Sequence, residues 1–209
     1  MAIQMQDGPE DGFAILQERL PDAYRHQQER KADGGGAAPE EIDLSRPHQV
    51  FSIDLHDLVG NDPLDQAKSI AWRYMLMNGT DAVASAELTT ETGGSAEYAG
   101  FFKSQFDRAT IEAVNRMEGK LHEDRDYEMR LLRIPEIYVI AVWLHSDVSD
   151  EFLPLEGVPP ELEQFAIYDR AAMSSALKTL GAAKLKDIAA EAYGLEEGME
   201  SEGVTMEPS

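Results

Sequence analysis

The chain has 209 residues, of which 43% are hydrophobic, so it can bury a core, and its length favours one domain over two. The chain carries 40 acidic residues against 18 Lys and Arg, which gives a formal net charge of -22 at pH 7. This charge repels phosphate backbones and anionic membranes, so we expect neither nucleic acid nor a membrane as a partner. The absence of cysteine excludes disulfides, thiolate metal ligands and a cysteine nucleophile.

The first residues lack the basic and apolar segments of an export signal, which predicts a cytoplasmic protein. Phe13, Leu16 and Leu20 have helical spacing up to Pro21, and a glycine-rich, charged stretch follows at 32–41. We therefore expect residues 1–41 to be a flexible appendage with a short helix, and the domain itself to span 42–194. A helix docked on that domain is the alternative.

Two strands and two helices are predicted between residues 49 and 118. Residues 49–55 alternate as in a strand with one wet face, and 82–88 predict a strand closed by Gly93-Gly94. Asp62-Pro63 resembles a helix start, and Trp72 lies off the apolar stripe of the helix that would follow. That stripe consists of Ala67, Ile70, Ala71, Tyr74 and Met77, and Asn78-Gly79 would end it. Residues 96–118 predict a further helix, with Gly119 as its end.

The longest apolar run, Ile137-Tyr-Val-Ile-Ala-Val-Trp-Leu144, predicts a central strand buried on both faces. Residues 128–134 predict a strand that pairs with it through a turn at Pro135-Glu136. Residues 151–155 predict a short edge strand, because Pro154 cannot donate to a ladder.

Two short helices are predicted near the C-terminus, one ending at Gly181 and the other at Gly194. Residues 195–209 are acidic, without Lys or Arg, and predict a disordered tail. The whole pattern predicts an α+β fold, with an antiparallel or mixed central sheet, helices packed on it and disordered acidic termini.

Arg130 and Arg133, near the Ile134-Pro135 step, are candidate anion ligands, because a guanidinium group can bind a carboxylate through two hydrogen bonds. Salt bridges to neighbouring acidic residues are the alternative. Trp72 is a candidate peptide anchor, because it lies off the predicted stripe. Tyr138 and Trp143 are expected in the core.

His56, His145 and Asp147 offer a set of two histidines and one carboxylate for a metal ion. Their spacing matches no HxH, HxxE or HExxH pattern, so polar strand ends are the alternative, and we expect no metal or other cofactor. Glu87, inside an apolar strand, is a buried proton acceptor, faces solvent or pairs with an arginine. His48 lies in a polar segment and is expected in solvent. The chain contains no GxSxG or phosphate-loop pattern.

A resemblance covers residues 62–163. It rests on Ala71-Trp-Arg-Tyr74, Ala82-Val-Ala-Ser-Ala-Glu87, the stretch from Leu132 to His145, Phe152-Leu-Pro-Leu155 and a following Pro-Pro-x-Leu step. This segment resembles a group of uncharacterised bacterial proteins, some of which are similar to accessory proteins of crocagin-type ribosomal-peptide biosynthesis. The resemblance implies binding of a precursor peptide without catalysis, and it identifies no catalytic residue.

Our leading hypothesis is a non-catalytic binding module for a peptide or protein, in which strand addition at a sheet edge is one mode of binding and Trp72, Arg130 and Arg133 are the candidate contacts. The second is a structural or assembly protein that docks through its termini or forms a homo-oligomer. The third is a metal-dependent enzyme that uses His56 and His145.

Overall fold

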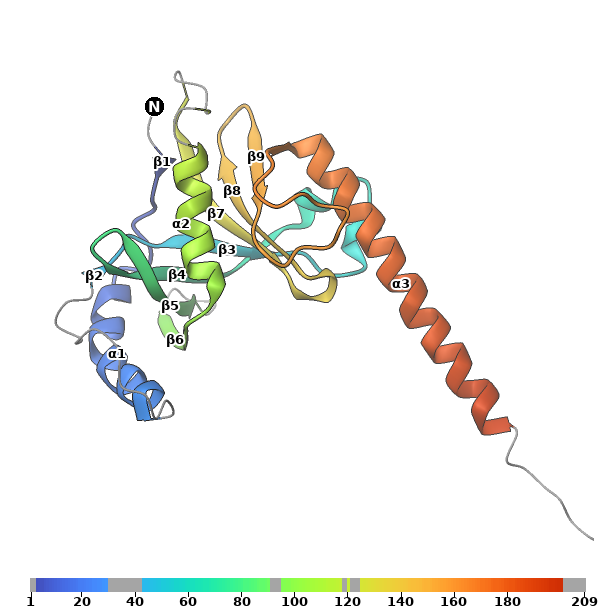
Figure 1. The fold of residues 1–209 in the computed structure, drawn as a ribbon, viewed down its shortest axis with the longest axis horizontal. Coiled ribbons are helices and arrows are strands. Elements are labelled where there is room, and N and C mark those ends of the chain that lie inside the picture. Colours follow the sequence, from blue (N-terminus) through green and yellow to red (C-terminus); the bar gives the residue numbers. More distant parts are fainter. Residues whose placement is uncertain (1–2, 30–42, 91–94, 118–119, 121–124, 201–209) are drawn as a thin grey trace, which may run out of the picture.

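The computed structural model describes residues 3–29, 43–90, 95–117, 120 and 125–200, apart from the side chains of 24–29 and 193–200. The described part contains three α-helices and ten strands (Figure 1). The helices are α1 (Gly12–Glu29), α2 (Gln105–Met117) and α3 (Arg170–Glu200), and short 3-10 helices lie at η2 (Asp57–Val59), η3 (Pro63–Gln66) and η4 (Pro135–Ile137). The strands are β1 (Ile3–Gln4), β2 (Asp43–Leu44), β3 (His48–Ser52), β4 (Lys68–Asn78), β5 (Asp81–Thr90), β6 (Ala96–Phe102), β7 (Tyr127–Ile134), β8 (Val139–His145), β9 (Asp150–Pro154) and β10 (Tyr168–Asp169).

The strands form one mixed sheet, so the α+β prediction is confirmed. The sheet runs β10-β9-β8-β7-β3-β4-β5-β6, with β1 beside β7 and β2 beside β4. The pairs β3–β7 and β1–β7 are parallel, and the others are antiparallel. The predicted central strand β8 is an inner strand between β7 and β9, whereas β7 and β3 form the middle of the sheet.

The β7–β8 hairpin forms at the predicted turn. Pro135 begins η4, and Tyr138 follows in the left-handed conformation with φ 54°. Tyr138 is 74% exposed, which corrects its expected place in the core, while Trp143 is buried as predicted. The register pairs Ile134 with Val139 at the turn and Glu128 with His145 at the far end.

The helix predicted after Asp62 is wrong. Asp62 does cap a helix, because its carboxylate accepts the Leu64 amide at 3.1 Å, but that helix is only η3. The chain then enters β4, whose central residues are buried on both faces of the sheet. A segment that is apolar on both sides also satisfies a helical stripe, and this explains the error.

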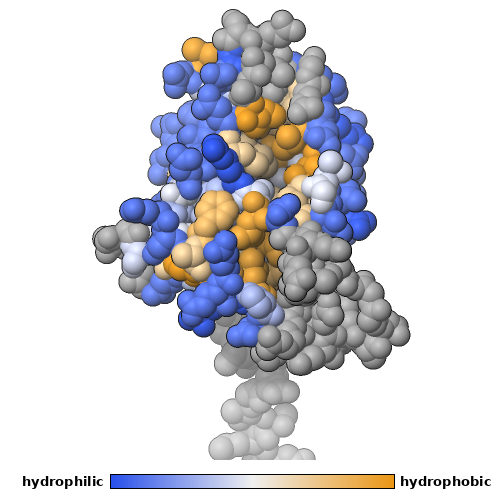
Figure 2. All heavy atoms as spheres, turned by 90° about the vertical axis from the view of Figure 1, so that its left-hand side faces the viewer, coloured by the Kyte–Doolittle hydropathy of each residue, from blue (hydrophilic) through white to orange (hydrophobic). Residues whose placement is uncertain are grey.

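The predicted N-terminal helix is docked on the domain, which corrects the expected appendage for residues 3–29. Leu16 of α1 is fully buried in a cluster with Tyr74 and Leu88, and Phe13 packs edge-on against the Tyr74 ring at 5.3 Å. Burial, together with the nearby Asp11, raises the pKa of Tyr74 to about 12. On the side of the molecule that carries α1, hydrophobic side chains gather at the centre of the view within a hydrophilic frame (Figure 2). Residues 30–42, with most of the glycine-rich stretch, lie outside the described part.

The segment predicted as one helix at 96–118 is instead the edge strand β6 followed by α2. Ser104 precedes α2, and its amide donates to the Asp107 carboxylate at 2.8 Å, as at a helix start of the capping-box type. Helix α2 lies across one face of the sheet (Figure 1), where Ala109, Ala113 and Met117 are buried. Gly93-Gly94 and Gly119 lie outside the described residues.

The two predicted C-terminal helices are one helix, α3, which packs on the opposite face through Met173 and Leu177. Gly181 does not end it. A Cβ there would lie 2.6 Å from the Leu58 Cβ, so glycine lets α3 approach η2 closely. The second half of α3 extends away from the sheet (Figure 1), and the predicted tail at 195–209 is helical to Glu200 and not described beyond it.

None of the described helices is long and apolar enough to span a membrane.

Candidate functional site

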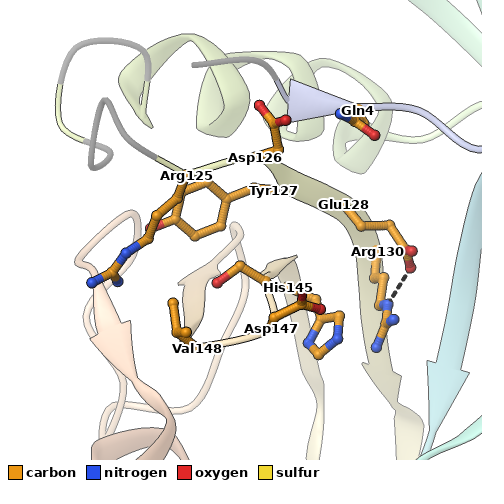
Figure 3. Close-up of a pocket in the computed structure, with 10 residues that line it drawn as sticks. Gln4, Arg125, Asp126, Tyr127, Glu128, Arg130, His145, Asp147 and Val148 are labelled. Carbon is orange, nitrogen blue, oxygen red and sulfur yellow. Dashed lines mark hydrogen bonds and ion pairs between the residues drawn. The ribbon is translucent and has the colours of Figure 1, made fainter.

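Three of the candidate residues, Arg130, His145 and Asp147, line one pocket at the end of the β7–β8 hairpin. Its volume is about 430 Å³, and we name it the His145 pocket. The hairpin register brings Glu128 opposite His145, and the β8–β9 turn adds Asp147. Arg125 and Asp126 complete the charged wall (Figure 3).

His145 is held by the buried carboxylate of Asp150. Asp150 Oδ1 lies 2.7 Å from His145 Nδ1 and accepts the Trp143 indole N–H at 2.8 Å, while Oδ2 accepts Arg170 Nη1 at 2.9 Å. The carboxylate at Nδ1 places the proton of a neutral ring there, so Nε2 has a free lone pair. Arg170 also binds Asp62 and Asp65, which ties α3 to this support.

Arg130 lies beside His145 in the pocket, and its guanidinium group packs against two aromatic rings. Its guanidinium lies 5.1 Å from the Phe51 ring centroid and 4.9 Å from that of Trp143. Its Nε donates to Glu128 Oε1 at 2.5 Å. This stacking and pairing fix the plane of the guanidinium and leave both terminal nitrogens for a ligand.

Two carboxylates of this region titrate below their ordinary range. Burial acts to raise the pKa of Asp150, but hydrogen bonds from His145, Trp143 and Arg170 outweigh it, so the net shift is downward. For Glu128, hydrogen bonds from Arg130 and Gln6 likewise outweigh burial and lower the pKa. Both groups are therefore ionised at neutral pH.

The other arginine candidate, Arg133, belongs to a buried network under α2. Its Nη1 and Nη2 bind Glu87 Oε1 and Oε2 at 2.7 and 3.0 Å. Arg73 lies 3.5 Å from Glu87 and donates to Asp107 at 2.7 Å. Glu87 is therefore paired with arginines, one of its three predicted placements, and Arg133 is already paired with a carboxylate.

His48 lies beside this network and is fully buried, contrary to the sequence-based expectation. Burial, together with the nearby Arg73, lowers its pKa to about 3. Neither ring nitrogen, nor Arg73 Nε, nor Ser85 Oγ has a partner among the described residues. Groups of this kind are normally satisfied by buried water.

Trp72 lies on the face of the sheet opposite the Arg73–Glu87 network and on the same face as Arg130, because Gln49 of β3 is opposite both Trp72 and Arg130. It is half-buried in the cluster beneath α1, opposite Leu88 of β5, which in turn is opposite Tyr98 of β6. The row Trp72, Leu88, Tyr98 leads to the edge of the sheet at β6. No described strand pairs with the outer side of β6.

His56 lies at the start of η2, exposed, and does not line the His145 pocket. Within the described ranges, no group of three His, Asp or Glu side chains is placed to hold a metal ion. The two-histidine set expected from the sequence is therefore not assembled there.

Comparison of the chain with protein-family models, with curated proteins and with solved structures gave no match.

Proposed function

We propose that the protein is a non-catalytic binding module that takes an extended peptide as an additional strand on the outer edge of β6. The observation that carries this proposal is the free edge itself. Strand β6 has seven residues and ends the main path of the sheet, and no strand of the described part pairs with its outer side. Such an edge presents unpaired N–H and C=O groups to a partner strand.

The composition of β6 supports this role. Its sequence, Ala96-Glu-Tyr-Ala-Gly-Phe-Phe102, contains neither Lys nor Pro, the residues with which proteins commonly protect an edge. Three of the seven residues are aromatic, and Phe102 is 41% exposed. These features favour pairing of β6 with a further strand, because the residues that usually prevent such pairing are missing from it.

Side chains of β6 on both faces of the sheet would contact the side chains of the bound peptide and so favour some peptide sequences over others. The register shift within β6 leaves Ala99 unpaired and puts Tyr98 and Phe101 opposite Leu88 and Ala86, on the face covered by α1. Phe102 and Gly100 lie on the α2 face, and the Phe102 ring lies close to Gly100. A partner strand would meet aromatic surface on both faces, which suits alternating apolar side chains.

Charge favours a basic peptide. The protein has a net charge of -22, and Glu97 is exposed on β6. A basic residue opposite Glu97 would form a cross-strand pair, and the overall field would speed the encounter. An accessory role in peptide biosynthesis, in the cytoplasm, is consistent with this binding mode and remains part of the proposal.

The experiment is a selection of displayed random peptides on the full-length protein, followed by titration of the best peptide. Strand addition uses the backbone, so N-methylation at alternate peptide positions should abolish binding, whereas methylation at the intervening positions should leave it intact. Phe102→Lys should weaken binding at least tenfold, and Ile188→Lys, at a similarly exposed site on α3, should not. Equal tolerance of N-methylation at all positions would contradict strand addition, and antiparallel self-pairing of β6 would appear as a dimer by light scattering.

A further inference from the structure

We propose that the His145 pocket binds a free α-amino acid, with Arg130 taking its carboxylate and the acidic wall taking its ammonium group. This site lies at β7 and β8, separated from β6 by β3, β4 and β5, and does not rest on the peptide-binding proposal.

Arg130 is the proposed ligand of the carboxylate group of the amino acid. Its Nε donates to Glu128, and among the described residues its Nη1 and Nη2 have no hydrogen-bond partner. Stacking against Phe51 and Trp143 holds the guanidinium plane in place. The two terminal nitrogens form the fork that binds a carboxylate through parallel hydrogen bonds.

The proposed ligands of the ammonium group of the amino acid are Asp126 and Asp147. Both line the pocket, and neither has an ion pair or hydrogen bond with another described side chain. In Figure 3, Asp126 lies at the rim near β1, and Asp147 lies on the opposite side, next to His145. In this view the Asp126 carboxylate points away from Asp147, so the two offer separate sites at the rim and next to His145, and a carboxylate without a partner can bind an ammonium group.

His145 adds a further polar group to the wall. His145 Nε2 is available for a hydrogen bond with a ligand, because Asp150 holds Nδ1. Tyr127 borders the pocket with its backbone strand, but its side chain is fully buried with Met129 and Leu131 on the α2 face of the sheet.

The charged side chains of the pocket wall favour a zwitterionic ligand. Three carboxylates (Asp126, Glu128 and Asp147) and two guanidinium groups (Arg125 and Arg130) share the wall. A simple anion would face the carboxylates and a simple cation would face the arginines, whereas a zwitterion can match both signs. The volume of about 430 Å³ lies at the small end of ligand pockets, which suits an amino acid and not a long chain.

The test uses the full-length protein and the twenty standard L-amino acids, each at millimolar concentration, read by thermal shift and by NMR of the His145 ring. At least one amino acid should bind, and its N-acetyl and amide derivatives, which lack the ammonium and the carboxylate charge respectively, should each bind at least tenfold more weakly. Binding of a blocked form as tight as that of the parent, or of none of the twenty, would overturn the proposal.

Variants locate the two contacts. Arg130→Gln should lose binding at least tenfold, and the paired change Asp126→Asn with Asp147→Asn, at residues without partners in the described part, should do so without unfolding the protein. Arg116→Gln, in an exposed ion pair on α2, is the matched control and should leave binding unchanged. Phe102→Lys should also leave it unchanged, because this change affects only the proposed peptide edge. Retention of full affinity by the Asp126/Asp147 variant would refute the assignment.

Discussion

His48 should cause the protein to lose stability as the pH falls from 7 to 5. In the folded state its pKa lies at about 3, because the ring is buried and Arg73 is nearby, whereas in the unfolded chain it is the ordinary 6.5. At pH 5 the unfolded chain therefore binds a proton at His48 that the folded chain does not bind. Stability rises with pH wherever the unfolded state binds more protons, so this contribution is complete above pH 6.5 and is lost as the pH falls from 6.5 toward 3.

The magnitude follows from the two pKa values. Well below the unfolded pKa, each pH unit costs about 1.4 kcal/mol of unfolding free energy. Between pH 7 and pH 5.5 the loss is about 1 kcal/mol, and by pH 5 it is about 2 kcal/mol. This is a large share of the roughly 5–15 kcal/mol by which a typical domain is stable.

The assay is urea unfolding of the wild type and of His48→Asn at pH 7, 6, 5.5 and 5. Asparagine keeps a polar side chain at this position but does not titrate. The difference in unfolding free energy between wild type and variant should change by about 2 kcal/mol between pH 7 and pH 5, in favour of the variant at low pH. In the folded wild type, the NMR signals of the His48 ring should not titrate down to pH 5. A difference that stays constant with pH, or a ring that titrates near pH 6.5, would refute the reasoning.

Three further changes test the packing. Asp107→Asn leaves Arg73 underpaired in the core and should cost about 3 kcal/mol in urea unfolding, whereas Glu112→Gln, in an exposed pair of the same helix, should cost at most about 0.5 kcal/mol; equal effects would contradict the buried network. Gly181→Ala should cost about 1–3 kcal/mol by calorimetry, because its Cβ would collide with Leu58, and a neutral result would count against the close approach of α3. Removal of residues 186–209 should leave the thermal midpoint unchanged, because every described side chain from 186 to 192 is exposed; a lowered midpoint would show that this end packs.

The strands whose patterns are unambiguous could be predicted from the sequence. The run at 137–144 is too apolar for one wet face, and Pro135 gives the turn, so the β7–β8 hairpin follows from local chemistry. Once that turn is fixed, counting back along both strands places Glu128 opposite His145. The meeting of Arg130 with His145 in one pocket was therefore implicit in the sequence, although the two had been considered for different sites.

The misassigned elements share a physical cause. Both β4 and β6 carry apolar residues on two faces, and such segments fit a helical stripe as well as a strand. The pairing of Arg73 with Glu87 requires β4 to lie beside β5 as a strand, and the helix that the sequence predicts there does not imply it. Burial of His48 depends on β3 lying between β4 and β7, a long-range pairing that no local pattern encodes. Asp150 was not singled out, because its role requires Arg170 from α3.

The central claim is that a peptide pairs with β6, and amide hydrogen exchange measured by NMR tests it most directly. The outward-facing amides of residues 96–102 should exchange quickly in the free protein. On addition of the selected peptide, every second amide of β6 should become protected, and contacts between the Hα atoms of the peptide and of β6 should appear. Protection confined to α2, α3 or the β9–β10 edge, with β6 unchanged, would contradict the account.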